Sequence, residues 1–369
     1  MCDSNDVCQK FSNFTSFEDF VALLNETYQG NITATAMTNC KPQICETLYG
    51  TGNADVSGIG VIVGYYVEFI IAVILALVLL MVNRTKYRNW SKAVRKVTAS
   101  YADSAIALAL SVELACAIML IKKNFGLGSY DFGALTVEIA WIVATLIILP
   151  IVNFCWQDLR DGKVELRLCM VSLTFVLFLI TFVSRMISTY SHGQIGSGED
   201  AVLDDRQRAE LDILCLGNDS GLPSTGSLVV EVFSVGGALW ASLIVAAAIT
   251  DQCLIGIQTS FTKRLRLEMG KLRDERWGLI INVIALVLWS VPQFWALMKL
   301  RNSQKQLAAN LGEPSGSDEW SFGQILAVVV FLPVFVEVLH QYLRRGKDGN
   351  QNECGIHGSV DNGVVEKAS

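Results

Sequence analysis

The chain has 369 residues, of which 52% are hydrophobic and only 17% are charged. This composition suits a polytopic membrane domain better than a soluble protein. The net charge of −6 has no simple interpretation, because acidic and basic residues fall in different connecting segments. The basic segments are expected to contact anionic lipid, and no nucleic-acid-binding motif accompanies them.

Seven apolar segments of the chain are each long enough, at about 20 residues, to cross roughly 30 Å of hydrocarbon. Because a lipid-exposed backbone must satisfy its own hydrogen bonds, these segments are expected to be helices. The predicted spans are 59–82, 102–121, 135–154, 167–187, 228–250, 277–297 and 322–343. The sequence therefore predicts an all-α membrane protein: a seven-helix transmembrane domain over 58–343, between an outer tail (1–57) and a disordered tail (344–369).

Lysine and arginine are unevenly distributed between the two sets of connections. Most of them follow the first, third, fifth and seventh spans, and such an excess marks the cytosolic face. The N-terminus is therefore predicted to be outside or lumenal and the C-terminus cytosolic. The first 30 residues show no pattern of a cleavable signal peptide, so the first span is expected to export the tail. Span length does not separate the endoplasmic reticulum from the plasma membrane as the location.

The outer tail carries four cysteines, Cys2, Cys8, Cys40 and Cys45. In an oxidising compartment such a set suggests two disulfides, with three possible pairings. Cys215, in the outer loop between spans four and five, allows a tail-to-loop bridge instead, and a further alternative leaves some of the thiols free. The cysteine spacing matches no metal site and no histidine accompanies it, so no metal or cofactor is expected.

The same outer segments carry glycosylation sequons. The predicted acceptors are Asn13, Asn25, Asn31 and Asn218. Asn83 and Asn89 also lie in sequons, but they fall in a predicted cytosolic loop and should stay unmodified. A short capped helix is predicted to begin after Ser16, and a second helix is predicted over 201–214 of the acidic outer loop.

Five ionisable residues lie inside predicted spans, where a charge is expensive and therefore a candidate for function. They are Glu68, Glu113, Glu138, Arg185 and Glu231, and by position all five fall in the outer half of the bilayer. If they face a shared interior, they form an acidic cavity with one cationic partner, open to the lumen. Three interpretations stay open: a proton donor, a cation path, or glutamates that pair with Arg185 and with interhelical hydroxyls to fix the bundle.

Other residues in the spans favour structural roles. Gly60-x-x-x-Gly64 and Gly236-Gly237 permit close approach of helices. Asp103, Asp251, Glu337 and His340 lie at the inner ends of spans, where interfacial anchoring is expected, and Glu337 and His340 are one turn apart. Prolines in spans three, six and seven are expected to kink them; these are Pro150, Pro292 and Pro333.

Several classes of enzyme and receptor are not indicated. The sequence contains no Walker A, HExxH, GxSxG or Gly-rich dinucleotide loop. The marks of rhodopsin-like receptors are missing as well. Seven spans with the N-terminus outside match receptors in topology only, which is weak evidence for function.

The segment Gly52-Asn53-Ala54-Asp55-Val56-Ser57-Gly58-Ile59-Gly60 resembles a GN-P-D-(I/V)-(A/S)-G-I-G signature. That signature opens the membrane domain of a group of fungal multi-span proteins, and here Ala54 stands in the place of proline. Tyr101-Ala102-Asp103-Ser104 and Leu149-Pro150 also fit the layout of that group. The architecture is further similar to the A-type membrane proteins of fungal indole-diterpene (paxilline and aflatrem) pathways.

This second resemblance implies a part in making a prenylated indole metabolite at an internal membrane, as an accessory or a cyclase-like component. Its implied partners are the lipid bilayer, a hydrophobic prenylated small molecule and other membrane-bound pathway enzymes. In the cyclase version one of the four glutamates named above donates the proton and Arg185 holds a neighbouring carboxylate. The alternative is a seven-span receptor or sensor, a transporter or an ion channel without enzymatic activity.

Overall fold

The computed structural model describes residues 8–12, 17–49, 58–82, 88–122, 134–158, 164–195, 205–217, 224–253, 276–311 and 322–355. Every regular element in these ranges is an α-helix or a 3-10 helix. Cys2, Asn13, Asn83 and Asn218, named above, lie outside the described residues, as does the chain beyond 355.

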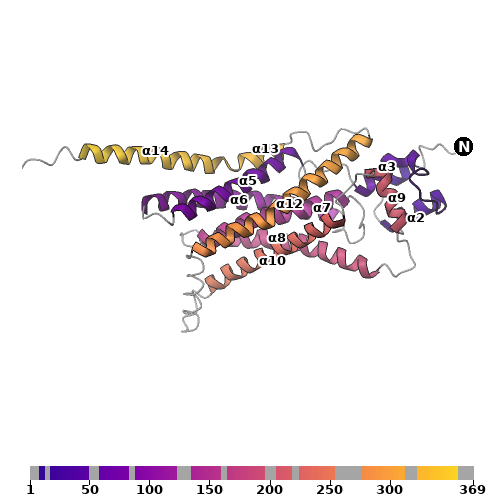
Figure 1. The fold of residues 1–369 in the computed structure, drawn as a ribbon, viewed down its shortest axis with the longest axis horizontal. Helices are drawn as coiled ribbons and strands as arrows, with labels where there is room; N and C mark the ends of the chain where they lie inside the picture. Colours follow the sequence, from indigo (N-terminus) through magenta and orange to yellow (C-terminus); the bar gives the residue numbers. More distant parts are fainter. Residues whose placement is uncertain are drawn as a thin grey trace, which may run out of the picture.

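Six helices among the described residues are long and apolar enough to cross a membrane, and they form a bundle (Figure 1). They are α5 (Ile59–Val82), α6 (Arg88–Lys122), α7 (Ala134–Asp158), α8 (Val164–Ile195), α10 (Ser224–Cys253) and α12 (Arg276–Leu311). Each contains one of the first six predicted spans, or nearly all of it. The outward faces are apolar, as a lipid-facing surface requires: Ile74, Leu173 and Leu243 are 53%, 48% and 66% exposed.

Helix α7 is the centre of this bundle. Its side chains from Ile139 to Phe154 are all buried, and it contacts α5, α6, α8, α10 and α12. A helix that is apolar all round is stable only when neighbours surround it. α7 therefore sets the positions of the polar side chains that project from the surrounding helices.

The predicted seventh span is not one continuous helix. It consists of α13 (Phe322–Val329) and α14 (Leu332–Gly355), separated by a turn at Val330 and Phe331. Pro333 has no N–H to donate to the Val329 carbonyl, and the Val334 N–H donates to the Phe331 carbonyl at 3.0 Å. The single helix predicted over 322–343 is therefore wrong. By contrast, α7 and α12 continue through Pro150 and Pro292.

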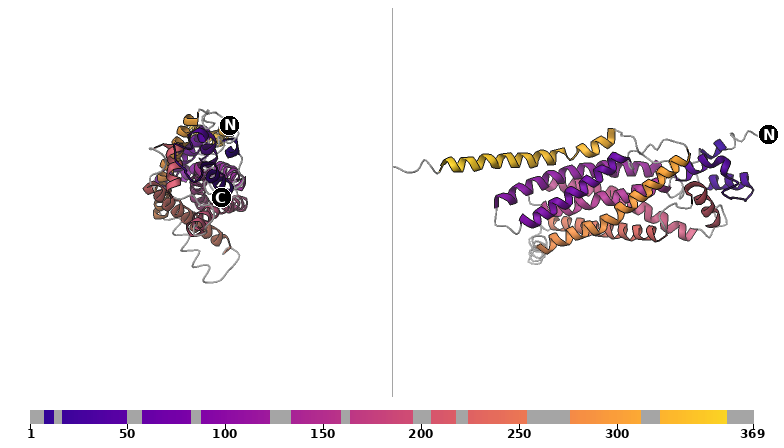
Figure 2. Two further views of the ribbon diagram at one scale, coloured as in Figure 1. Left: turned by 90° about the vertical axis from the view of Figure 1, so that its right-hand side faces the viewer. Right: turned by 45° about the horizontal axis from the view of Figure 1, so that its top comes forward.

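Helix α14 also runs further than the sequence indicates. It remains helical to Gly355, well beyond residue 344, where the disordered tail is predicted to begin. Figures 1 and 2 show it projecting past the end of the bundle. Residues 344–355, predicted as part of the disordered tail, are therefore helical in the described part of the chain.

Two predicted close approaches between helices are confirmed. A Cβ atom added to Gly64 would lie 3.1 Å from the Cβ atom of Ala327, so α5 packs tightly on α13. A Cβ atom at Gly236 would lie 2.3 Å from the Trp289 ring, so α10 packs tightly on α12. In lipid, such contacts supply packing that the hydrophobic effect cannot.

A small folded unit, here called the cap (residues 8–12, 17–49 and 205–217), lies at one end of the bundle (Figures 1 and 2). It contains α2 (Phe17–Tyr28), α3 (Lys41–Tyr49) and α9 (Asp205–Leu216), with the 3-10 helices η1 (Lys10–Ser12) and η2 (Thr38–Cys40). Its own hydrophobic core includes Phe20, Leu24 and Leu211, together with Leu307 from the end of α12. The helix predicted after Ser16 is confirmed, and α9 occupies most of the helix predicted over 201–214.

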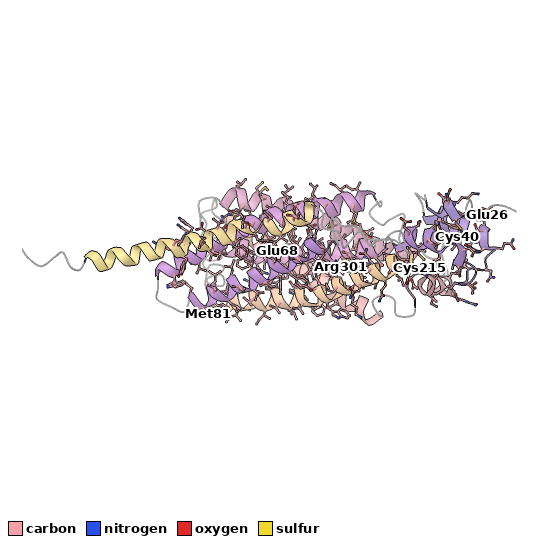
Figure 3. The ribbon with its side chains drawn as sticks, turned by 90° about the horizontal axis from the view of Figure 1, so that it is seen from above. Glu26, Cys40, Glu68, Met81, Cys215 and Arg301 are labelled. Atoms are coloured by element: carbon pink, nitrogen blue, oxygen red, sulfur yellow. A yellow bond between two sulfur atoms is a disulfide. The ribbon has the colours of Figure 1, made fainter. Side chains whose placement is uncertain are left out.

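Two disulfides hold the cap together. Cys8 pairs with Cys40 and Cys45 pairs with Cys215, with Cα–Cα distances of 5.0 and 5.3 Å. The prediction that all four tail cysteines pair with one another is therefore wrong: one disulfide joins two of them, and the other is the tail-to-loop bridge. Cys45 is close to Cys215 because α3 packs on α9, an arrangement that cysteine spacing alone does not reveal. Figure 3 labels Cys40 and Cys215 in the cap and Glu68 within the bundle.

Candidate functional site

Three of the five candidate residues lie together near the cap end of the bundle. Glu138 at the start of α7 forms a salt bridge with Arg185 of α8, whose side chain is 16% exposed. The Arg185 guanidinium also lies over the ring of Trp141, 5.5 Å from its centroid, a cation–π arrangement. Glu231 of α10 is exposed, within electrostatic range of Glu138. This group contains both charge signs.

The other two candidates lie apart from Arg185, between α5 and α6. Glu68 is 2% exposed and Glu113 is 0% exposed. Tyr65, itself 2% exposed, lies within electrostatic range of both glutamates and of Cys116. We call Tyr65, Glu68, Glu113 and Cys116 the carboxyl cluster. The five candidates thus fall into two groups, and within the described residues they do not show the shared interior on which a single acidic cavity depends.

The carboxyl cluster lies deeper in the bundle than the ion pair. The Cys116 thiol donates to the Ala140 carbonyl of α7 over 3.8 Å, so these two residues lie at about the same distance from the cap along the bundle. Glu113 precedes Cys116 by almost one turn of α6, a helix that approaches the cap, so it lies further from the cap. Glu138 precedes Ala140 on α7, a helix that leaves the cap, so it lies nearer to the cap.

The polar atoms of the cluster are poorly satisfied within the described residues. Both carboxyl oxygens of Glu113, Oε1 of Glu68 and the Tyr65 hydroxyl are buried and make no hydrogen bond there. A buried polar group without a partner costs about 1–3 kcal/mol. An ionised carboxylate costs far more in apolar surroundings unless a cation accompanies it. The cluster therefore contributes little to stability, and its chemistry is available for a ligand or a proton.

Tyr101 connects this region to the break in the seventh span. Its hydroxyl donates to the backbone carbonyl of Glu68 at 3.2 Å. Its ring lies 5.1 Å from that of Phe154 in α7 and 6.2 Å from that of Phe331, in the turn between α13 and α14. The hydrogen bond and ring contacts fix α5, α6 and the broken helix relative to one another.

At the opposite end of the bundle the ionisable residues have local partners. Asp103 of α6 accepts two hydrogen bonds from Arg167 of α8, at 2.6 and 2.9 Å, and its side chain is 53% exposed. Glu337 accepts a hydrogen bond from Gln341 at 2.6 Å, rather than one from His340. The Asp251 side chain lies outside the described residues. The anchoring roles expected for Asp103 and Glu337 stay predictions.

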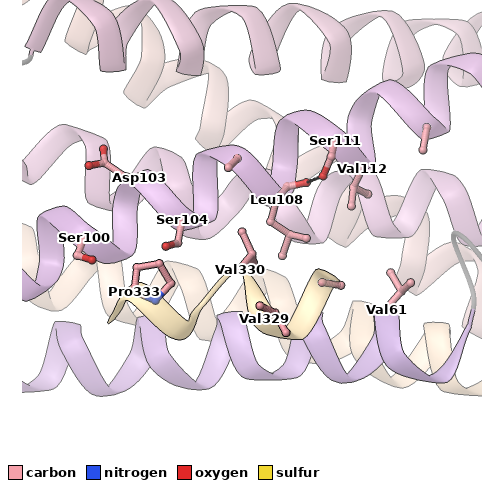
Figure 4. A pocket seen from close by; sticks show the side chains of 13 residues that line it. Val61, Ser100, Asp103, Ser104, Leu108, Ser111, Val112, Val329, Val330 and Pro333 are labelled. Atoms are coloured by element: carbon pink, nitrogen blue, oxygen red, sulfur yellow. Dashed lines mark hydrogen bonds between the residues drawn. The ribbon is translucent and has the colours of Figure 1, made fainter. Parts of the chain in front are cut away.

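A groove of about 810 Å³ opens between α6 and the broken helix α13–α14. One side is formed by a single face of α6, which includes Ser100, Ser104, Leu108 and Ser111. The other side is formed by residues at the helix break and by Val61 of α5. Figure 4 shows this arrangement from close by. None of the carboxyl cluster residues lines the groove.

Sequence reasoning missed several buried polar residues. Arg301 and Gln304 of α12 are 5% and 1% exposed, and the Gln304 amide donates to the Thr136 hydroxyl of α7 at 3.2 Å. They fall beyond the predicted span, which ends at 297, and were therefore expected in an outer loop. The apolar residues Leu300 and Leu307 at helical spacing were the available signal that the helix continues.

Comparisons with known proteins identify no family. No protein-family model, no curated protein and no solved structure matches this chain. Within the described residues, no group of three or more His, Cys, Asp or Glu side chains could hold a metal ion.

Proposed function

We propose that this chain is a multi-pass membrane protein that donates a proton to a hydrophobic, prenylated substrate in a fungal secondary-metabolite pathway of the indole-diterpene type. The observation that carries the proposal is Glu113, which is 0% exposed and has both carboxyl oxygens without a hydrogen bond in the described residues. Apolar surroundings favour the neutral acid over the carboxylate. The pathway is suggested by the resemblance of Gly52–Gly60 and of the architecture.

The chemistry is a protonation-initiated cyclisation. The O–H bond of the neutral acid breaks and a C–H bond forms at one end of a substrate double bond. The resulting carbocation is attacked by a neighbouring double bond to close a ring. Loss of a proton from the final carbocation to the carboxylate forms the last double bond and restores the acid, so no co-reactant is consumed. Glu113 is the proposed donor, and Glu68 and the Tyr65 hydroxyl are its proposed proton partners.

The proposed topology places the cap in the lumen of the endoplasmic reticulum or outside the plasma membrane. In this topology, α13–α14 makes the seventh crossing of the membrane and the C-terminus is cytosolic. Two cap disulfides suit an oxidising compartment, and the sequence assigns most lysines and arginines to the connections predicted on the opposite side. The helices α5 to α8 separate Cys45 from Cys215, and an even number of crossings returns the chain to the same side. Asn25 and Asn31 of the cap are the proposed glycosylated residues within the described chain.

The test is replacement of each buried acid by its uncharged isostere in a producing host. Glu113→Gln should lower metabolite output by about 10²-fold or more, the usual loss when a positioned acid is removed. Glu231→Gln is the matched control: this side chain is exposed, and output should be unchanged. Output is normalised to the amount of folded protein in the membrane. If Glu113→Gln and Glu68→Gln both retain full output, the proton-donor role is wrong, and an accessory role is favoured.

A second candidate is a transporter, an ion channel or a ligand sensor, which the break between α13 and α14 favours. Discontinuous helices commonly build binding sites at membrane depth in transporters. A transporter or a channel predicts a proton or cation flux in proteoliposomes of the purified protein that Glu113→Gln abolishes, whereas a cyclase-like protein shows no such flux. A ligand sensor predicts a ligand-dependent response instead of a flux.

A further inference from the structure

We propose that the groove between α6 and α13–α14 binds an uncharged lipid alcohol that enters sideways from the bilayer. The groove has a volume of about 810 Å³, within the range of roughly 300–1,000 Å³ typical of small-molecule sites. It is lined by residues outside the carboxyl cluster, and the proposal does not depend on the proposed enzymatic function.

The length of the groove suits a long amphiphile. Its α6 wall runs from Ser100 to Ala115, about 22 Å at 1.5 Å per residue. This is about three quarters of the roughly 30 Å hydrocarbon core. The Ala115 end is lined by apolar residues such as Val112 and Val61, whereas the Ser100 end is polar. The groove therefore has the polarity of an amphiphile aligned with the lipids.

The groove is open on the outer surface of the bundle. On its α6 wall, Asp103, Ala107 and Ser111 are exposed, and on the opposite wall Val329 and Pro333 are exposed. These residues belong to helices whose neighbouring outward faces are apolar and suited to lipid contact. An occupant would therefore arrive from the bilayer rather than from the aqueous phase.

Hydrogen-bond donors line the polar end of the groove. Most hydroxyls on the bundle helices bond to their own backbone: Thr98 donates to the Val94 carbonyl and Ser111 to the Leu108 carbonyl. For the Ser100 and Ser104 hydroxyls no such bond is found in the described part of the chain. Figure 4 shows both serines turned toward the groove, with Pro333 opposite. Both hydroxyls can therefore donate to an oxygen atom of a ligand.

Hydrogen-bond acceptors are provided by the helix break. Pro333 offers no N–H to the Val329 carbonyl. The Val334 N–H, which a continuous helix would direct to Val330, donates to Phe331 instead. Val329 and Val330 both line the groove. A ligand hydroxyl group, which both donates and accepts, complements serines on one wall and backbone carbonyls on the other.

Charge at this end of the groove favours a neutral head group. Asp103, the charged residue in the lining, is paired with Arg167 by two hydrogen bonds at 2.6 and 2.9 Å. The pair carries no net charge, so it offers little attraction to a phosphate or an ammonium group. The fit is therefore to an alcohol of the sterol or diacylglycerol kind.

The experiment is photolabelling of the full-length protein in nanodiscs with two pairs of diazirine-bearing probes. One pair is a sterol and its sulfate ester, and the other is a diacylglycerol and the corresponding phosphatidic acid. Peptides of α6 and α13–α14 should be labelled by at least one alcohol about tenfold more than by its charged partner. Labelled peptides are identified by mass spectrometry.

Two variants connect the labelling to the groove. Ala107→Phe places a ring in the groove and should reduce labelling about tenfold. Ala246→Phe is the matched control, since Ala246 is likewise exposed but lies on α10. Ser100→Ala combined with Ser104→Ala should weaken binding of the alcohol about five- to thirtyfold, the loss expected for two hydrogen bonds. The proposal is overturned if neither alcohol labels the groove, if the charged probes label it equally, or if Ala107→Phe and Ala246→Phe behave alike.

Discussion

Two regions of the bundle hold carboxyl groups under opposite conditions. Near the cap, Glu138 is paired with Arg185, and the two side chains remain 26% and 16% exposed. In the carboxyl cluster, Glu113 is completely buried and makes no hydrogen bond within the described residues. The first arrangement stabilises the bundle through pairing, whereas the second adds a burial cost. The comparison separates a group that supports the fold from a group that is available for chemistry.

The largest expected effect comes from breaking the ion pair. Arg185→Met leaves Glu138 without its cation, and removing one partner of a buried pair costs about 3–5 kcal/mol. Because both side chains are partly exposed, we expect a loss of about 2 kcal/mol in the free energy of unfolding. This quantity is measured by reversible unfolding in detergent micelles.

The control for this change is Arg167→Met at the other end of the bundle. Its partner Asp103 is 53% exposed, and exposed pairs contribute about 1 kcal/mol or less. Equal losses for the two variants would contradict the view that Arg185 has a special stabilising role.

Replacing Glu113, whose carboxyl group makes no hydrogen bond within the described residues, should change the free energy of unfolding in the opposite direction. Glu113→Leu removes a buried carboxyl group and keeps apolar volume, so the free energy of unfolding should rise by about 1 kcal/mol. The same change at Glu138 should lower it, because Arg185 then loses its carboxylate. A loss for Glu113→Leu as large as that for Glu138→Leu would show that Glu113 has a stabilising partner after all.

An effect of similar size tests the link between the carboxyl cluster and the helix break. Tyr101→Phe removes the hydroxyl that donates to the Glu68 carbonyl and keeps the ring contacts with Phe154 and Phe331. The expected loss is about 1 kcal/mol, the contribution of one hydrogen bond. Tyr66→Phe is the control, because its ring is stacked on Phe294 and no hydrogen bond of its hydroxyl is found in the described chain. Equal losses in the free energy of unfolding for the two variants would show that the hydrogen bond of the Tyr101 hydroxyl does not stabilise the bundle.

The helices were predictable from the sequence because few backbone structures other than a helix satisfy all of their own hydrogen bonds in lipid. The first six spans follow from length and apolar composition alone. The seventh shows the limit of this reasoning. Pro150, Pro292 and Pro333 have the same local chemistry, yet only Pro333 lies beside a helix end. Surrounding helices cover α7 on all sides and hold it together around Pro150, which no property of the local sequence reveals.

The candidate site was predictable in its residues but not in its grouping. Glu68 and Glu113 are conspicuous because charges are rare in spans. Their separation from Arg185 depends on the rotation of α5 and α6 about their axes and on the level at which they meet α7. Tyr101 and Cys116 were missed for the same reason, since a tyrosine or a cysteine in a span has no distinctive pattern until its neighbours are known.

The composition of the cap has a consequence for the order in which the chain matures. Cys8 and Cys40 can pair once α5 has carried the tail across the membrane, so their pairing needs nothing from the helices that follow α5. Cys45 pairs only after residue 215 has been made, and the cap core requires Leu307. The earliest residues to leave the ribosome are thus among the last to reach their final packing. Until then the Cys45 thiol stays unpaired with Cys215, and the apolar surface of the cap lacks the contact with Leu307.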